Sequence, residues 1–173
     1  MTDNPVTIRL FAEADVTGVR TLFIKVNRLL APPDLKDAFE DYIVSSLLEE
    51  IDRVSDYYRE RLGSFWVAVS GRDIVGMFGL EPSGPDAMEL RRMYVDPGQR
   101  RRGIARTMLE FAENECRKAD MRQLDLSTSE IQSDALSFYI NSGYELVREE
   151  VADTASNKTI GGGIRRFHFV KML

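Results

Sequence analysis

The chain has 173 residues, of which 43% are hydrophobic and 29% charged, a composition that predicts an ordinary soluble globular protein with one domain over residues 1–173. The net charge of −5 disfavours a nucleic acid or a membrane as partner, and the single cysteine and single histidine exclude an internal disulfide and a zinc site built from His and Cys. No apolar run approaches the roughly 20 residues of a membrane span, and the polar N-terminal segment does not resemble a secretory signal, so we expect a cytoplasmic protein.

The first half of the chain predicts one strand, two helices and a β-hairpin. The expected elements are a strand at 6–11, helices at about 14–30 and 35–59, and antiparallel strands at 64–70 and 74–81. Asp34 stands directly before the second helix, where we expect it to cap the helix N-terminus.

The second half alternates strands with helices before it ends in two strands. The expected elements are a strand at 89–96, a helix at 103–119, a strand at 123–129, a helix at about 133–142, and strands at 144–151 and 164–172. A glycine-containing loop at 152–163 joins the last two strands. With one strand-helix-strand crossover among antiparallel pairs, the order predicts an α+β fold with a mixed, mostly antiparallel sheet of about seven strands flanked by helices.

An arginine-rich loop connects the strand at 89–96 to the following helix. A local group of arginines stands out against the acidic background: Arg91, Arg92, Arg100, Arg101, Arg102 and Arg106. The first amides of a helix lack intrahelical acceptors and carry partial positive charge, and Gly103 and Ala105 leave the backbone open to a close approach. The pattern indicates a site for a compact anion such as a phosphate. The alternative is a solvated surface run in which Gly103 is a plain turn residue.

The helix that follows the loop has one apolar face, which should dock it on the sheet with its N-terminus at the loop. That face consists of Ile104, Ala105, Met108, Leu109, Phe111, Ala112 and Cys116.

Two separated motifs carry a family resemblance. Arg100-x-x-Gly103-x-Ala105 directly follows the strand ending in Met-Tyr-Val-Asp-Pro, and the segment from Ala135 to Tyr144, Ala-Leu-Ser-Phe-Tyr-Ile-Asn-Ser-Gly-Tyr, lies about thirty residues later. This pattern resembles the Gcn5-related N-acetyltransferase (GNAT) superfamily. The resemblance implies the GNAT fold, with the sheet splayed between the central strands at 89–96 and 123–129. It also implies acetyl-coenzyme A as co-substrate, without a metal, and acetyl transfer to a primary amine by direct attack in a ternary complex.

The resemblance also implies which residues contact the coenzyme. The strand contributes Met93, Tyr94 and Val95, with backbone groups of Met93 and Val95 pairing with the pantetheine arm. The loop and helix start contribute Arg100, Arg101, Arg102, Gly103, Ile104, Ala105 and Arg106, whose backbone amides from Arg101 onward receive the diphosphate. The second motif contributes Gln132, Ala135 and Tyr139, which share one helix face while Leu136 and Ile140 lie on another.

Two residues are implied in the chemistry. Tyr139 matches a tyrosine that the family often uses as general acid, and a phenol is a protonated donor at neutral pH. Glu89 matches a carboxylate that some members use as general base, with a water chain as the alternative. The competing interpretations are a core tyrosine for Tyr139, and for Glu89 an exposed strand-end residue or the ion-pair partner of a nearby arginine.

Other conspicuous residues predict structural roles. Cys116 should be a buried thiol, and His168 a surface or hydrogen-bonded strand residue. Phe65 and Trp66 should belong to the core. The acidic residues Glu49, Glu50 and Asp52 are either solvated or attract a cationic substrate.

Two other function classes remain open. A noncatalytic acetyl-coenzyme A sensor or protein-interaction module would retain the loop, and Tyr139 argues against it; a nucleic-acid-binding domain is disfavoured by the acidic charge. We expect a small-molecule or peptide amine as acceptor, selected by the segments at 14–59 and 152–163, whose sequences do not identify it. A homodimer is an open alternative to a monomer.

Overall fold

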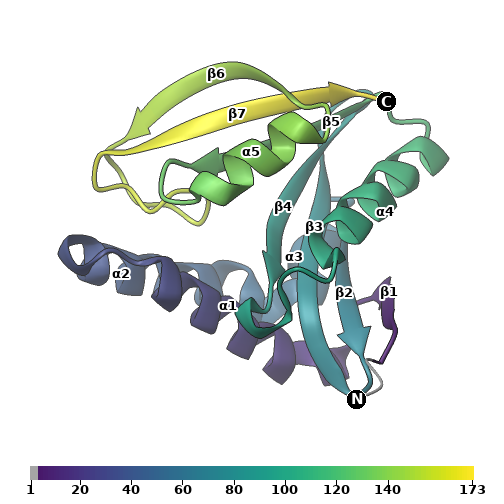
Figure 1. The fold of residues 1–173 in the computed structure, drawn as a ribbon, viewed down its shortest axis with the longest axis horizontal. Coiled ribbons are helices and arrows are strands. Elements are labelled where there is room, and N and C mark those ends of the chain that lie inside the picture. The colour runs from purple at the N-terminus through teal and green to yellow at the C-terminus, as the bar shows by residue number, and fades with distance from the viewer. Residues whose placement is uncertain (1–3) are drawn as a thin grey trace.

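The computed structural model describes residues 4–173, which contain a seven-stranded sheet in the order β1-β2-β3-β4-β5-β7-β6 (Figure 1). The strands are β1 (Val6–Leu10), β2 (Ser64–Ser70), β3 (Asp73–Gly84), β4 (Ala87–Val95), β5 (Gln123–Ser129), β6 (Glu145–Ala152) and β7 (Ile164–Met172). Neighbouring strands are antiparallel except β4 and β5, which are parallel. The predicted mixed, mostly antiparallel sheet is confirmed.

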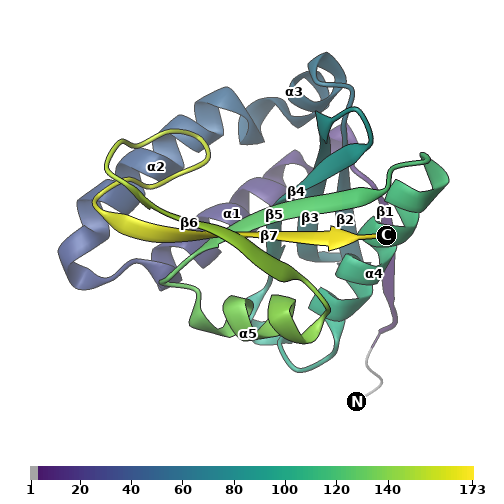
Figure 2. The ribbon, with the colours of Figure 1, turned by 90° about the horizontal axis from the view of Figure 1, so that it is seen from above.

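Helices cover both faces of this sheet, as the view from above shows (Figure 2). One layer consists of α1 (Val16–Leu30), α2 (Lys36–Glu49) and α3 (Val54–Glu60), and the other of α4 (Ile104–Lys118) and α5 (Ser133–Asn141). Side chains alternate between the faces: Val67 and Met77 belong to the core under α1 to α3, whereas Ala68 and Phe78 belong to the core under α4 and α5. The apolar residues of α4 pack there as predicted, since Ile104, Met108 and Cys116 are all buried.

The prediction of one continuous helix at 35–59 is wrong. The helix is interrupted after α2 at Glu50, whose backbone angles of φ −137° and ψ −59° are not helical, and a 3-10 turn at Ile51–Arg53 leads into α3. Glu50 and Ile51 are both fully buried, and the interruption lets both side chains point inward.

The expected cap at Asp34 is also wrong. Pro33 starts a short 3-10 turn, Pro33–Leu35, so Asp34 lies inside that turn and Leu35 occupies the N-cap position of α2 without a side-chain hydrogen bond.

The two central strands separate partway along their length. Pairing between β4 and β5 covers Ala87 to Glu89 against Gln123 to Asp125, although β4 continues to Val95 and β5 to Ser129. On its other side, β4 has a register irregularity against β3 between Arg91 and Tyr94, and Arg92 has a positive φ of 54°. An irregularity of this kind twists a strand away from its neighbour. The predicted splay between the central strands is therefore confirmed, and it begins after Glu89.

Among residues 4–173, none of the helices is sufficiently long and apolar to cross a membrane.

Candidate active site

The separation of β4 from β5 opens a cleft of about 120 Å³. Its walls come from α1, α2, β4, β5, α5, β7 and the segment between β6 and β7. Six residues that the sequence nominated line it together: Glu89, Met93, Tyr94, Gln132, Ala135 and Tyr139. The edge of β4 beyond Glu89 is not paired with β5, so its backbone groups are available to an extended ligand.

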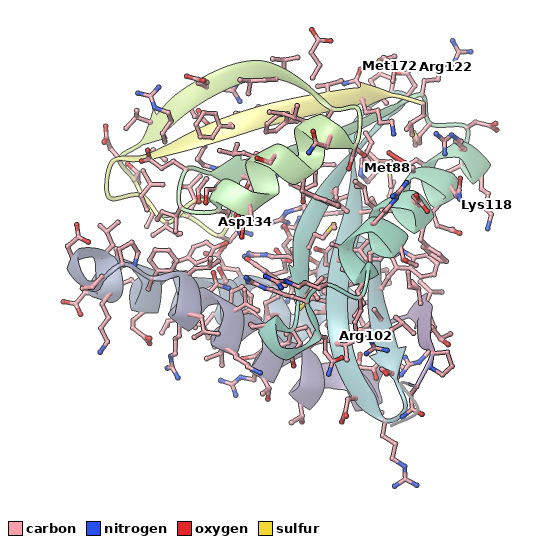
Figure 3. All side chains as sticks on the ribbon, in the orientation of Figure 1. Met88, Arg102, Lys118, Arg122, Asp134 and Met172 are labelled. Carbon is pink, nitrogen blue, oxygen red and sulfur yellow. The ribbon has the colours of Figure 1, made fainter. Side chains whose placement is uncertain are left out.

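Val95 and residues 100–106 do not line this cleft. They continue from the β4 wall, through the 3-10 turn Pro97–Gln99, to the N-terminus of α4. Arg102, labelled in Figure 3, lies in this loop and donates to the Gln99 side chain at 2.5 Å and to the backbone carbonyl of Asn4 at 2.8 Å. Arg100, Arg101 and Arg106 are exposed.

Gly103 shapes the start of α4. Its φ of 72° lies in the left-handed region, and a Cβ built on it would meet no atom within 4 Å. Arg101 is also left-handed, with φ 66°, a conformation that costs energy in a residue with a side chain. The loop therefore presents the free amides at the start of α4 next to open space, an arrangement that fits a diphosphate.

Arg91 and Arg92 do not belong to this basic loop, which corrects the grouping of all six arginines. Both are buried, and both form ion pairs with Glu50: Arg91 Nη2 to Oε1 at 2.9 Å, and Arg92 Nε to Oε2 at 3.1 Å. Consecutive residues of a regular strand point to opposite faces, but the irregularity at Arg92 turns both guanidinium groups to one side. Glu50 is accordingly neither solvated nor free to attract a substrate.

Glu50 has further partners that complete a buried polar network. Tyr58 donates its hydroxyl hydrogen to Glu50 at 2.9 Å, and Arg92 donates to the Tyr42 hydroxyl at 2.6 Å. Burial raises the pKa of Tyr58 well above its usual range, and the Glu50 carboxylate adds to the shift. The sequence analysis did not predict this network. Two consecutive arginines within a strand, Arg91 and Arg92, were the feature that could have indicated it.

Tyr139 combines a core ring with a position on the cleft. The residue is buried, and its ring centroid lies 5.8 Å from that of Tyr144 and 6.2 Å from that of Phe169. Burial alone raises the pKa of Tyr139, with no charged or hydrogen-bonded neighbour contributing. The phenol therefore stays protonated and is free to donate.

Glu89 lies where β4 and β5 part, and it has a partner that the sequence did not predict. Lys158, from the segment between β6 and β7, places Nζ 3.1 Å from Glu89 Oε2 and 3.2 Å from Glu81 Oε1. Glu81 on β3 is directly opposite Glu89 in the β3–β4 pairing. The hairpin that joins β3 and β4 could have indicated from sequence that Glu81 and Glu89 are neighbours. No feature of the sequence indicated that Lys158 lies beside them.

Gln132 occupies the N-cap position of α5, and its side-chain oxygen accepts a hydrogen bond from Thr128 at 2.7 Å. Asp134, labelled in Figure 3, lies in the first turn of the same helix. The hydrogen bond ties the start of α5 to β5, so Ala135 and Tyr139 are held on the cleft side.

The remaining candidates have structural roles. Cys116 is buried, and burial raises the pKa of its thiol to about 11, so it is not a nucleophile at neutral pH. His168 contacts Glu150 at 2.7 Å, as expected of a hydrogen-bonded strand histidine. Phe65 is buried, and the partly buried Trp66 stacks on Phe78.

Of the other acidic candidates, Glu49 is exposed and Asp52 is 3.4 Å from Arg20. Residues 4–173 contain no group of three or more His, Cys, Asp or Glu side chains that could hold a metal ion.

Comparison with known proteins adds an independent finding. A model described as "Acetyltransferase (GNAT) domain" matches residues 61–146, which include β2 to α5. The chain is 29% identical over 145 residues to Probable N-acetyltransferase 14 of Xenopus tropicalis, a match that covers 83% of this chain and 70% of that protein. It is 30% identical over 116 residues to N-acetyltransferase 8F1 of Rattus norvegicus, covering 62% of this chain and 51% of that protein. The chain thus spans between about half and seven tenths of the length of these relatives.

Among solved structures, the PaiA N-acetyltransferase of Thermoplasma acidophilum, in complex with coenzyme A, has the same fold, with a TM-score of 0.71 and 22% identity over 98% of this chain and 99% of that one. The matched domain spans the splayed strands, the arginine-rich loop and both motifs. From its sequence and its fold together, the chain belongs to the Gcn5-related N-acetyltransferase superfamily.

Proposed function

We propose that the protein transfers an acetyl group from acetyl-coenzyme A to a primary amine by direct attack in a ternary complex. The observation that carries this proposal is the parting of β4 and β5 at Glu89, which brings Glu89 and Tyr139 to the same cleft. Family membership supports the reaction type. We take residues 1–173 to form a single catalytic domain.

The coenzyme has two sets of contacts in this proposal. Backbone groups of Met93 and Val95 on the unpaired edge of β4 bind the pantetheine arm as a further strand would. The amides from Arg101 to Arg106 bind the diphosphate, and the open space at Gly103 admits it. The exposed side chains of Arg100 and Arg101 add long-range attraction.

Two side chains move the protons. An amine attacks only in its neutral form, and Glu89 accepts the proton from the ammonium directly or through a water chain. As the nitrogen bonds to the acetyl carbon, the carbon–sulfur bond breaks and Tyr139 donates a proton to the departing thiolate. The second proton of the nitrogen then passes through water to Tyr139, so that the amide and the phenol are both neutral. Burial raises the pKa of Tyr139, so the phenol is protonated at neutral pH and has a proton to donate.

The alternative is a noncatalytic acetyl-coenzyme A sensor. It would need the loop and the edge of β4, but neither a carboxylate nor a phenol at the cleft. The presence of both groups in one cleft favours the enzyme.

Calorimetric titration with acetyl-coenzyme A, followed by a coenzyme A release assay over a panel of amines, tests the proposal. The panel should include amino acids, polyamines, aryl amines and peptides with free N-termini or lysines. We expect binding together with release that depends on at least one amine. Binding without release by any amine would favour the sensor, and absence of binding would overturn both.

A further inference from the structure

We propose that Lys158 is an intramolecular acceptor, so that the protein acetylates its own Lys158 side chain. This inference rests on the proposed acetyl transfer and concerns a segment, 153–163, to which neither motif assigns a role. It starts from a primary amine that already lies against the proposed base.

The position of the Lys158 amine is defined by two carboxylates. Nζ is 3.1 Å from Glu89 and 3.2 Å from Glu81, on strands β4 and β3. Lys158 also lines the cleft that Tyr139 and Gln132 line. An acceptor amine would need this same location, within reach of the base and on the cleft that separates β4 from β5.

The segment that carries Lys158 is anchored on both sides of it. The carbonyl of Asn157 accepts a hydrogen bond from the buried Arg92, and Ile160 packs against the core under α1 to α3. Ser156 and Thr159 close a turn around the lysine, with the Ser156 amide donating to the Thr159 carbonyl at 2.8 Å. Because the amine is held in place by these contacts, little conformational freedom is lost when it reacts.

The charge state of Lys158 agrees with the role of Glu89. Burial opposes the charge of the ammonium, but Glu89 and Glu81 outweigh it, so the pKa of Lys158 is raised. The resting amine is therefore protonated and must pass a proton to Glu89 before it reacts. The neutral nitrogen then attacks the acetyl carbon, the carbon–nitrogen bond forms and the carbon–sulfur bond breaks. The thiolate takes a proton from Tyr139, and the second proton of the nitrogen passes through water to Tyr139, which restores the phenol.

Acetylation would also change the cleft. The product amide carries no charge, so Glu81 and Glu89 would each lose an ionic partner. Glu81 is mostly buried, and its second oxygen, Oε2, already has no hydrogen-bond partner among residues 4–173. Glu89 would thus be released to receive the ammonium group of an external acceptor, whereas Glu81 would keep Arg91, whose Nη1 lies 3.5 Å from Glu81 Oε1.

The test is intact-mass analysis of the purified chain, first treated with a deacetylase, after incubation with acetyl-coenzyme A alone. We expect one acetyl group, mapped by peptide sequencing to Lys158. The fraction of protein acetylated per unit time should be independent of protein concentration. Lys118 is an internal control, because it also pairs with a glutamate but its side chain is 72% exposed against 49% for Lys158. Non-enzymatic acetylation would favour Lys118. Lys158→Arg should abolish the modification, and Tyr139→Phe should slow it by the factor by which it slows transfer to an external amine.

The outcomes separate this inference from the proposed function. If external amines are acetylated while Lys158 is not, or if acetyl groups spread to Lys118, the inference is wrong and the proposed function stands. An increase in the fraction acetylated per unit time with protein concentration would also overturn it, since that indicates transfer between molecules. If acetyl-coenzyme A neither binds nor releases coenzyme A with any amine, both proposals fail.

Discussion

The hydroxyl of Tyr139 is the group whose removal separates chemistry from binding. Tyr139→Phe keeps the ring contacts with Tyr144 and Phe169, so fold and coenzyme affinity should be retained. Turnover should fall roughly 10- to 1000-fold, on the lower side of general-acid effects, because a thiolate leaves tolerably without assistance. The measurements are kcat with an acceptor from the panel and calorimetric affinity for acetyl-coenzyme A. Unchanged kcat, with chemistry shown to be rate-limiting, would leave Tyr139 as a packing residue.

Glu89 can be tested by a substitution that preserves its size. Glu89→Gln still offers Lys158 a hydrogen-bond acceptor but cannot take a proton, so turnover should fall by roughly 10²–10⁴-fold with coenzyme binding nearly intact. Glu149→Gln, on the exposed surface of β6, is the control. Equal turnover at every pH would transfer the role of base to a water chain.

At the scale of an element, the start of α4 depends on the absence of a side chain at Gly103. Gly163 provides a matched control: its φ is 74° against 72° for Gly103, and a Cβ at either position would meet no atom within 4 Å. Alanine at either site pays the left-handed strain of about 1–2 kcal/mol. Of the two variants, only Gly103→Ala should weaken acetyl-coenzyme A binding. The expected loss is roughly tenfold, equivalent to one lost charge-assisted hydrogen bond of about 1.5 kcal/mol.

Calorimetry on both glycine variants, with circular dichroism to verify folding, makes the comparison. Equal affinity in the two variants would mean that the diphosphate does not approach the backbone at Gly103. Arg101→Ala should have the smaller effect, because its exposed side chain supplies only part of the attraction.

At the scale of the whole molecule, Glu50 joins the helical layer of α1 to α3 to the irregular part of β4. Removing Glu50 would leave Arg91 and Arg92 buried without this ionic partner. Glu50→Ala should therefore lower the free energy of unfolding by about 3–5 kcal/mol. The neighbouring Glu49 is exposed, and Glu49→Ala should change stability by no more than about 0.5 kcal/mol. Urea denaturation measures both, with Glu50→Gln as the milder variant if the alanine protein does not fold. Equal stability of the Glu49 and Glu50 variants would contradict the role assigned to this network.

The sequence by itself determined the order of the strands and helices, the splay of the sheet and the family. The order of the elements follows from apolar periodicity, which involves residues close together in the chain. The splay and the family follow from the resemblance carried by the two motifs. The motif around Tyr139 also predicted that Gln132, Ala135 and Tyr139 line the cleft, and all three do.

Only the tertiary structure decided which charges meet. Glu50 and Arg92 are 42 residues apart, and Glu89 and Lys158 are 69 residues apart. No local periodicity encodes such pairs, because an exposed charge and a buried, paired charge look alike in sequence until a partner is placed beside them. For this reason the interrupted helix at Glu50, the burial of Arg91 and Arg92, and the amine of Lys158 at the proposed base became visible only once the sheet and its covering helices brought distant segments together.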